Sequence, residues 1–125
     1  MRKWGCLALL VFGAMPAYAD ATDISATAAI FDEAVGTGHA KAYSLDGPVV
    51  VTQASTANCV THLRSGKDDW SIDWTASSIN ADETTDKILM ISMGPTQDFA
   101  LLFNDTGKLR AARSAGETLA TACAK

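Results

Sequence analysis

Between residues 45 and 113 the chain has no amphipathic helical pattern long enough to connect two parallel strands. It has instead six short segments rich in β-branched or apolar residues, at 49–53, 57–65, 70–76, 87–94, 98–104 and 108–113. The connections include the sequences LDGP, GKDD and NDTG, whose Gly, Asn and Asp residues favour tight turns. Because a parallel pair needs a crossover of about a dozen residues or more, we predict that consecutive strands pair antiparallel.

Two of these segments allow more specific predictions. Segment 87–94, KILMISMG, is a continuous apolar run, which predicts a strand that is covered on both faces or central in its sheet. Segment 108–113, KLRAAR, is more polar and is predicted to be an edge strand.

A helical pattern precedes the strands. Residues 23–36 place apolar side chains four, three and four positions apart, at Ile24, Ala28, Phe31 and Val35. This spacing predicts one buried helix face, with Asp32 and Glu33 outside and a stop at Gly36 and Gly38.

A second helical pattern follows the strands, in residues 114–125. Ser114 is a candidate N-cap, and Glu117 follows it three residues later, as in a capping box. Leu119, Ala122 and Cys123 are predicted to share one face. The whole order predicts an α+β domain, in which a bent antiparallel sheet of about six short strands is flanked by an N-terminal and a C-terminal helix. A β-sandwich carrying two helices is the second interpretation.

The sequence WSIDW alternates apolar and polar residues from Trp70 to Trp74. Alternate side chains of a strand share a face, so Trp70, Ile72 and Trp74 are predicted to face the core, with Ser71 and Asp73 facing solvent. A stacking platform for a sugar or an aromatic ligand is the rival interpretation.

The first nineteen residues have the three parts of a secretory signal peptide. Arg2 and Lys3 supply positive charge, an apolar run follows, and the sequence AYA ends at Ala19. We therefore expect cleavage after Ala19, a single domain over residues 20–125, and a periplasmic or secreted location in a bacterial envelope. No membrane anchor is expected once the signal is removed.

Cleavage would leave two cysteines, Cys59 and Cys123. An even number of cysteines in an exported chain predicts a disulfide. The pair lacks the Cys-x-x-Cys spacing of redox-active sites, so the predicted bond is structural.

The charge of the predicted domain disfavours nucleic acid as a partner. Two of the ten Lys and Arg residues fall in the signal, which leaves eight against 14 acidic residues, a net charge near −6. An acidic surface repels phosphate backbones. Asp82, Glu83 and Asp86 lie in one polar connection and are candidate contacts for a protein partner with a basic surface.

Residue patterns indicate no metal site, no cofactor and no catalytic residue. His39 and His62 lie far apart in the sequence and lack the local spacing of metal ligands. No nucleophile motif occurs, although a triad of a serine, His62 and an aspartate stays open because triad order differs between folds. His62, Trp70 and Trp74 are the candidate residues of a ligand pocket.

These observations favour a non-enzymatic, exported module that binds another protein. Inhibitors and immunity proteins against secreted toxins share its size, acidic charge, signal peptide and single disulfide, which is an analogy of class. The alternative is a small hydrolase or small-ligand binder with a cavity between the sheet and the first helix.

Overall fold

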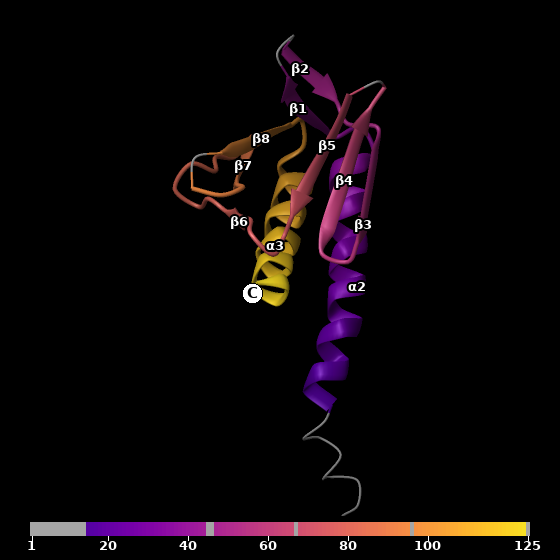
Figure 1. The fold of residues 1–125 in the computed structure, drawn as a ribbon. Helices are drawn as coiled ribbons and strands as arrows, with labels where there is room; N and C mark the ends of the chain where they lie inside the picture. The colour runs from indigo at the N-terminus through magenta and orange to yellow at the C-terminus, as the bar shows by residue number, and fades with distance from the viewer. Residues whose placement is uncertain (1–14, 45–46, 67, 96, 125) are drawn as a thin grey trace, which may run out of the picture.

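The computed structural model describes residues 15–44, 47–66, 68–95 and 97–124, and the side chains from residue 24 onward with the exception of Ser44. Figure 1 shows the helices lying beside the strands. The helices are α2 (Met15–Gly36) and α3 (Thr106–Cys123). The strands are β1 (Ala40–Ser44), β2 (Gly47–Val50), β3 (Gln53–Ala57), β4 (Val60–Ser65), β5 (Asp68–Asp73), β6 (Ser78–Ile79), β7 (Ile88–Ser92) and β8 (Asp98–Phe103).

The predicted α+β class is confirmed, and so is the antiparallel pairing. The strands divide between a five-stranded sheet, ordered β2-β1-β8-β7-β6, and a three-stranded sheet, ordered β3-β4-β5. Every strand pair is antiparallel. The edges of the five-stranded sheet are β2, which contains Pro48, and β6, which has two residues.

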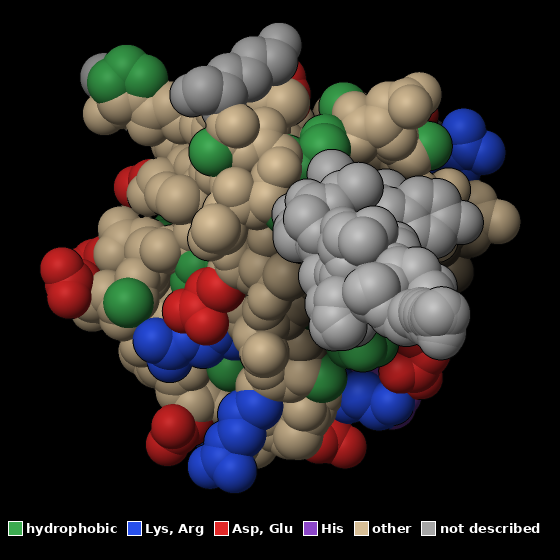
Figure 2. All heavy atoms as spheres, turned by 90° about the horizontal axis from the view of Figure 1, so that it is seen from below, with side chains coloured by type: hydrophobic (Ala, Val, Ile, Leu, Met, Phe, Trp, Pro, Cys, Tyr) green, Lys and Arg blue, Asp and Glu red, His purple; other side chains and the backbone are tan. Residues whose placement is uncertain are grey.

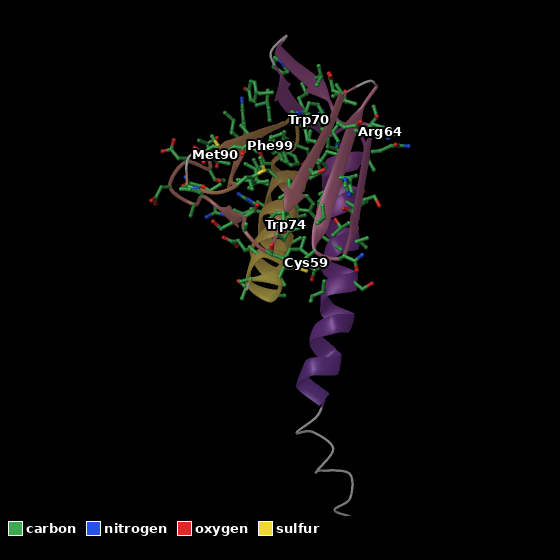
Figure 3. All side chains as sticks on the ribbon, in the orientation of Figure 1. Cys59, Arg64, Trp70, Trp74, Met90 and Phe99 are labelled. Carbon is green, nitrogen blue, oxygen red and sulfur yellow. A yellow bond between two sulfur atoms is a disulfide. The ribbon has the colours of Figure 1, made fainter. Side chains whose placement is uncertain are left out.

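One hydrophobic core joins the inner faces of both sheets to the two helices. Trp74 is its largest fully buried side chain. Its ring meets Phe31 of α2 edge-to-face, with centroids 5.3 Å apart, and its Nε1 donates to Thr61 Oγ1 at 2.7 Å. Trp70 and Phe99 bring the two sheets together, with ring centroids 6.2 Å apart (Figure 3).

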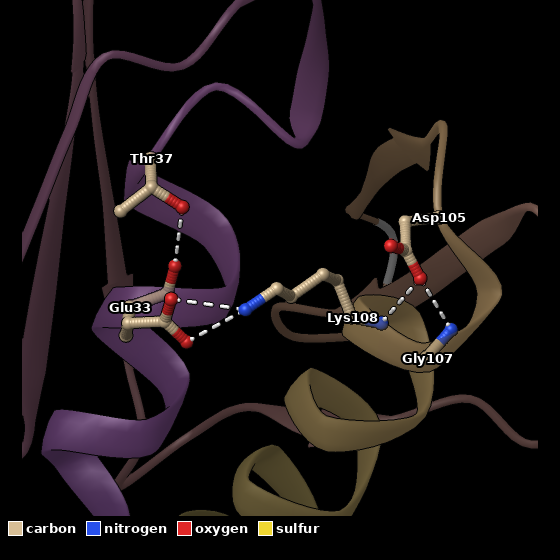
Figure 4. A network of polar contacts seen from close by, with 5 residues as sticks. All are labelled: Glu33, Thr37, Asp105, Gly107 and Lys108. Atoms are coloured by element: carbon tan, nitrogen blue, oxygen red, sulfur yellow. Dashed lines mark hydrogen bonds and ion pairs between the residues drawn. The ribbon is translucent and has the colours of Figure 1, made fainter.

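The two helices also share a polar contact, drawn in Figure 4. Lys108 Nζ lies 3.1 and 2.9 Å from the two carboxylate oxygens of Glu33. Nearby, Thr37 Oγ1 donates to the Glu33 carbonyl at 2.7 Å, at the end of α2. Since both charges are partly exposed, this pair orients the helices more than it stabilises them.

Helix α2 confirms the predicted apolar face, because Ala28, Phe31 and Val35 are buried and Ile24 packs against them. The helix begins at Met15 rather than near residue 23. Its first turn contains Pro16, which a first turn tolerates because its missing N–H would have no partner there. The predicted cleavage position after Ala19 therefore lies within α2 and stays a prediction, and most of the predicted signal lies outside the described residues.

Asp32 was predicted to lie outside, and this was wrong. Its Oδ2 accepts from the Thr56 amide at 3.0 Å, and its Oδ1 accepts from the Thr56 hydroxyl at 2.7 Å. The carboxylate thus holds α2 against β3. Helix and strand approach so closely that a Cβ on Gly36 would lie 2.6 Å from the Ala54 amide nitrogen.

Segment 108–113 is helical, and its prediction as an edge strand was wrong. Asp105 caps α3 by accepting from the amides of Gly107 and Lys108, so the predicted NDTG turn is a helix start. Ser114 is exposed within the helix and does not cap it. The buried face continues through both halves of the helix, at Leu109, Ala112, Ala115, Gly116, Leu119 and Cys123. Ala122 is exposed instead of sharing that face.

Several strand assignments differ from the prediction. Strand β5 covers Asp68–Asp73 rather than 70–76, and the short strand β6 was not predicted. The predicted strand 49–53 is divided, because β2 ends at Val50 and β3 begins at Gln53. The predicted strand 57–65 is broken by a two-residue turn at Asn58 and Cys59, which have φ of 53° and 63°. Strand β1 was missed, because the small residues Ala40 and Ala42 form its buried face. The LDGP turn lies partly outside the described residues.

The disulfide connects this two-residue turn to the last residue of α3. Cys59 and Cys123 are bonded, 64 positions apart in the sequence. The Cys59 carbonyl also accepts from the Trp74 amide at 2.8 Å, so the turn contacts the end of β5 as well. The bond therefore joins the hairpin β3–β4 to the C-terminal helix.

Candidate protein-binding surface

The outer face of the five-stranded sheet, which points away from the core, carries apolar side chains on four neighbouring strands. We call this set the outer apolar face. It consists of Tyr43 on β1, Pro48 and Val50 on β2, Ala100 and Leu102 on β8, and Ile88 and Met90 on β7. Tyr43 is 44% exposed and Val50 40% exposed, while the residues of β7 and β8 are half-buried.

The strand register gathers these side chains into rows. Lys41 is opposite both Val50 and Leu102, and Leu102 is opposite Ile88. A second row contains Tyr43 opposite Pro48, and Met90 opposite Ala100. Side chains opposite each other in adjacent strands are neighbours on one face. The apolar side chains therefore form two neighbouring groups, one on β1 and β2 and one on β7 and β8, with the charged Lys41 between Val50 and Leu102.

No other described element packs against the outer apolar face. In β7, Leu89 and Ile91 are fully buried, whereas the alternating Ile88 and Met90 keep part of their surface exposed. Segment 87–94 was predicted to be covered on both faces or central, and β7 does have a neighbour on each side. Its outer face, however, is not covered by any described element of the chain. Exposed, contiguous apolar surface commonly marks an interaction site.

An acidic loop borders this face between β6 and β7. Asp82, Glu83 and Asp86 are exposed, and none of them belongs to an ion pair formed among the described residues. The loop is ordered by its own hydrogen bonds. Asn80 Oδ1 accepts from the Glu83 amide, and Thr84 Oγ1 accepts from the Met90 amide at 3.1 Å. The second bond ties the acidic loop directly to β7.

The structure brings only two of the three candidate pocket residues, His62 and Trp70, to the same hollow. Trp74 is fully buried, and Trp70 is partly buried on the inner face of the three-stranded sheet. His62 is exposed on the opposite face, where its Nδ1 lies 3.1 Å from Ser71 Oγ. A surface hollow of about 380 Å³ includes His62 and Trp70 but not Trp74. Ser71 and Asp73 are exposed, as the alternation predicts, and Asp73 also accepts from the Thr75 amide and hydroxyl.

A second hollow, of about 400 Å³, lies between α2 and the β3–β4 turn. Its lining includes Ala28, Ala29, Asp32 and Asn58, and the carboxylate of Asp32 is already engaged by Thr56. Among the described residues, no group of three or more His, Cys, Asp or Glu side chains is arranged to hold a metal ion. In the same part of the chain, neither helix is both long and apolar enough to cross a membrane.

The face seen from below differs from the outer apolar face. Figure 2 shows hydrophobic side chains scattered there among acidic and basic ones. The exposed Ile30 of α2 is a large apolar residue that does not belong to the outer apolar face.

Sequence reasoning identified the acidic residues but missed the outer apolar face. Two of its exposed members, Tyr43 and Val50, lie in the missed β1 and at the end of the shortened β2. The signal available in the sequence was segment 87–94. Alternate side chains of a strand point to opposite faces, so a continuous apolar run places apolar side chains on the outer face as well as on the inner one.

Comparisons with known proteins support the fold. A scan against protein-family models finds no match, and a search of the curated proteins finds none. Among solved structures, the chain is similar to the PH domain from PfAPH, with a TM-score of 0.60, 13% identity, and coverage of 80% of this chain and 90% of that chain. It is also similar to the PH domain from TgAPH, with a TM-score of 0.58, 12% identity, and coverage of 83% and 96%. At these identities the likeness shows the fold alone.

Proposed function

We propose that this chain is an exported, non-enzymatic module of a bacterial envelope that binds another protein, in the manner of an inhibitor or an immunity protein. The observation that carries the proposal is the outer apolar face, which extends over four strands and has no described element against it. A likeness to PH domains is compatible with a binding role.

We assign the outer apolar face to the centre of the interface and the acidic loop to its rim. Tyr43 is the best candidate for an anchor, because exposed aromatic side chains bury a large area at small entropic cost. Asp82, Glu83 and Asp86 would face basic side chains on the partner and would accelerate the encounter. The partner is therefore a separate protein with an apolar patch bordered by Lys or Arg.

Site-specific cross-linking tests this assignment. A photoreactive residue replaces Tyr43 or Met90 in protein exported to the envelope, and Ile30 serves as the matched control, since it is exposed and apolar but lies on α2. The proposal expects one protein to be captured from the two sheet positions and not from position 30. Capture of the same protein from position 30, or of a second copy of this chain from the sheet positions, would contradict it.

Affinities measured with the captured partner sharpen the test. Tyr43→Asp and Met90→Asp are each expected to weaken binding about tenfold or more, because they bury a charge at the centre of the interface. Neutralising the loop with Asp82→Asn, Glu83→Gln and Asp86→Asn should mainly lower the association rate and its dependence on salt. An unchanged affinity in both aspartate variants would exclude the outer apolar face as the interface.

The export part of the proposal has an independent test. Intact mass of the protein recovered from the envelope should correspond to a chain beginning at Asp20. A mass that retains residues 1–19, or a lipid adduct on Cys6, would contradict export by a cleaved signal without excluding a binding role.

A further inference from the structure

A third surface hollow, of about 390 Å³, lies at one end of the five-stranded sheet, where β1, β8 and the start of α3 meet. Its lining includes Lys41, Lys87, His39, Leu102 and Phe103. Backbone hydrogen bonds fix this corner, because the Phe103 amide donates to the Lys87 carbonyl at 2.7 Å and the Asn104 amide donates to the His39 carbonyl at 3.1 Å. The lysines are therefore carried by a rigid frame.

The charges at this hollow are unusual for the molecule. Among the described Lys and Arg residues, Arg64, Lys108 and Arg113 form ion pairs with Asp69, Glu33 and Glu117. Lys41, Lys87 and Arg110 form none. Two of these three unpaired cations thus line the same hollow in a chain whose net charge is −4.

The rest of the lining is suited to an anion with an apolar portion. Leu102 supplies apolar surface beside the buried Phe103, while Asn104 and Thr106 supply polar groups. Thr106 is also the first residue of the 18-residue helix α3. The Asp105 carboxylate beside it is already occupied by the amides of Gly107 and Lys108.

The two other hollows lack this combination. The one beside His62 contains Arg64, whose Nε lies 3.1 Å from Asp69 Oδ1, so its cation is already neutralised. The one beside α2 is lined by the Asp32 carboxylate and by neutral side chains.

We propose that the hollow between β1, β8 and α3 binds a small organic anion, a carboxylate or phosphate group joined to a short apolar chain. Lys41 and Lys87 hold the anionic group, and Leu102 contacts the chain. The volume is within the range of small-ligand sites, roughly 300–1,000 Å³. This site shares Leu102 with the outer apolar face, and it differs from the proposed protein interface in ligand class and in the lysines that hold the anionic group.

Titration of isotopically labelled protein, followed by NMR, tests the proposal with octanoate, octyl phosphate, inorganic phosphate and octanol. Octanoate or octyl phosphate should shift the amide signals of Gly38, His39, Asn104 and Thr106. Inorganic phosphate and octanol should each bind about tenfold more weakly or worse, since each supplies only half of the complementary chemistry. The tighter of the two octyl compounds identifies the preferred anionic group.

Substitutions separate the site from general surface charge. The pair Lys41→Met and Lys87→Met retains chain length and should raise Kd about tenfold or more, through loss of two charged contacts. The pair Lys41→Arg and Lys87→Arg should bind within about threefold of the parent, since the charge is kept. Arg110→Met removes an unpaired cation outside the hollow and should leave Kd unchanged.

Two results would overturn the proposal. One is a Met pair that folds, by its amide spectrum, and binds octanoate and octyl phosphate as tightly as the parent. The other is a set of ligand shifts centred outside this hollow. If the Met pair does not fold, the Arg pair, Arg110→Met and the position of the shifts decide the question.

Discussion

The two sheets share one core but differ on their outer faces. The three-stranded sheet presents Gln53, Ser55, His62, Arg64, Asp69 and Ser71, all exposed. Several of these pair across strands, as Ser71 does with His62 and Arg64 with Asp69. The five-stranded sheet presents the outer apolar face instead. The polar groups on the outer face of the three-stranded sheet bond to water and to one another across strands. The outer face of the five-stranded sheet exposes apolar area that association would remove from water.

This difference indicates that the need for a buried core explains only part of the apolar pattern. Both inner faces are apolar because the domain needs a core, whereas only one outer face is apolar, and the core does not explain it. The part of the outer apolar face that stays exposed gives the isolated chain no hydrophobic stabilisation. Under the proposed function, a partner would bury that part.

The largest expected effects lie on the shared inner faces. Trp74→Ala at the end of the three-stranded sheet should reduce the free energy of unfolding by about 3–5 kcal/mol, and Leu101→Ala in the five-stranded sheet by about 2–5 kcal/mol. Both side chains are fully buried. Denaturant melts measure the loss. A loss below about 1 kcal/mol for Trp74→Ala would instead support the ligand-platform interpretation of the tryptophans.

Loss of the disulfide is expected to have the next largest effect on the free energy of unfolding, and it affects the three-stranded sheet. Removing it with Cys59→Ala and Cys123→Ala should cost about 2–4 kcal/mol. Hydrogen exchange should rise first at the end of α3, because that end loses its attachment to the β3–β4 turn. A uniform rise over both sheets would contradict local release.

The conformation of Cys59 gives this experiment a matched control. Its φ of 63° is disfavoured for a residue with a side chain but not for glycine. The pair Cys59→Gly and Cys123→Ala should therefore be about 1 kcal/mol more stable than the pair with alanine at both positions. Equal stabilities would show that the turn relaxes once the bond is gone.

The fold class could be predicted from the sequence because turn residues and apolar runs are local signals. The helix–strand errors share a physical cause. Segment 108–113 looked like an edge strand, but the Asp105 cap and the spacing from Leu109 to Leu119 continue one helix through it. Cys59 gave no turn signal, since a cysteine at positive φ is uncommon.

The candidate sites were harder to predict than the fold. The acidic loop could be identified from composition, because Asp82, Glu83 and Asp86 are close in sequence. The outer apolar face and the hollow near Lys41 could not, because they assemble residues from strands far apart in the chain. His62 and Trp74 fall on opposite sides of the three-stranded sheet, so their proximity in sequence was no guide to a shared pocket.

A smaller effect tests how α2 covers the inner side of the three-stranded sheet. Gly36→Ala would place a Cβ 2.6 Å from the Ala54 amide nitrogen. Because that contact is with backbone, the helix must move away from β3, at a cost of about 1–3 kcal/mol in unfolding free energy. Thermal or denaturant melts measure it, with Ala29→Gly as a control for helix propensity alone. A stabilised Gly36→Ala variant would show that the approach is looser than described.

The smallest effect on stability should come from the outer faces themselves. Tyr43→Ser with Val50→Ser should change the free energy of unfolding by about 1 kcal/mol or less, since both side chains are largely exposed. The same pair should reduce binding of the hydrophobic dye ANS. The reciprocal change Ser71→Val on the three-stranded sheet should increase it. Unchanged ANS binding in both variants would contradict the described difference between the two outer faces.

The two edges of the five-stranded sheet have a consequence for aggregation. An open edge can template the addition of strands from other molecules, and proteins prevent this with proline or with very short edge strands. Here one edge, β2, contains Pro48, and the other, β6, has two residues. Fibril-like growth along the sheet is thus opposed at both ends. A molecule that associates with the five-stranded sheet is thus directed to stack on the outer apolar face rather than to extend the sheet.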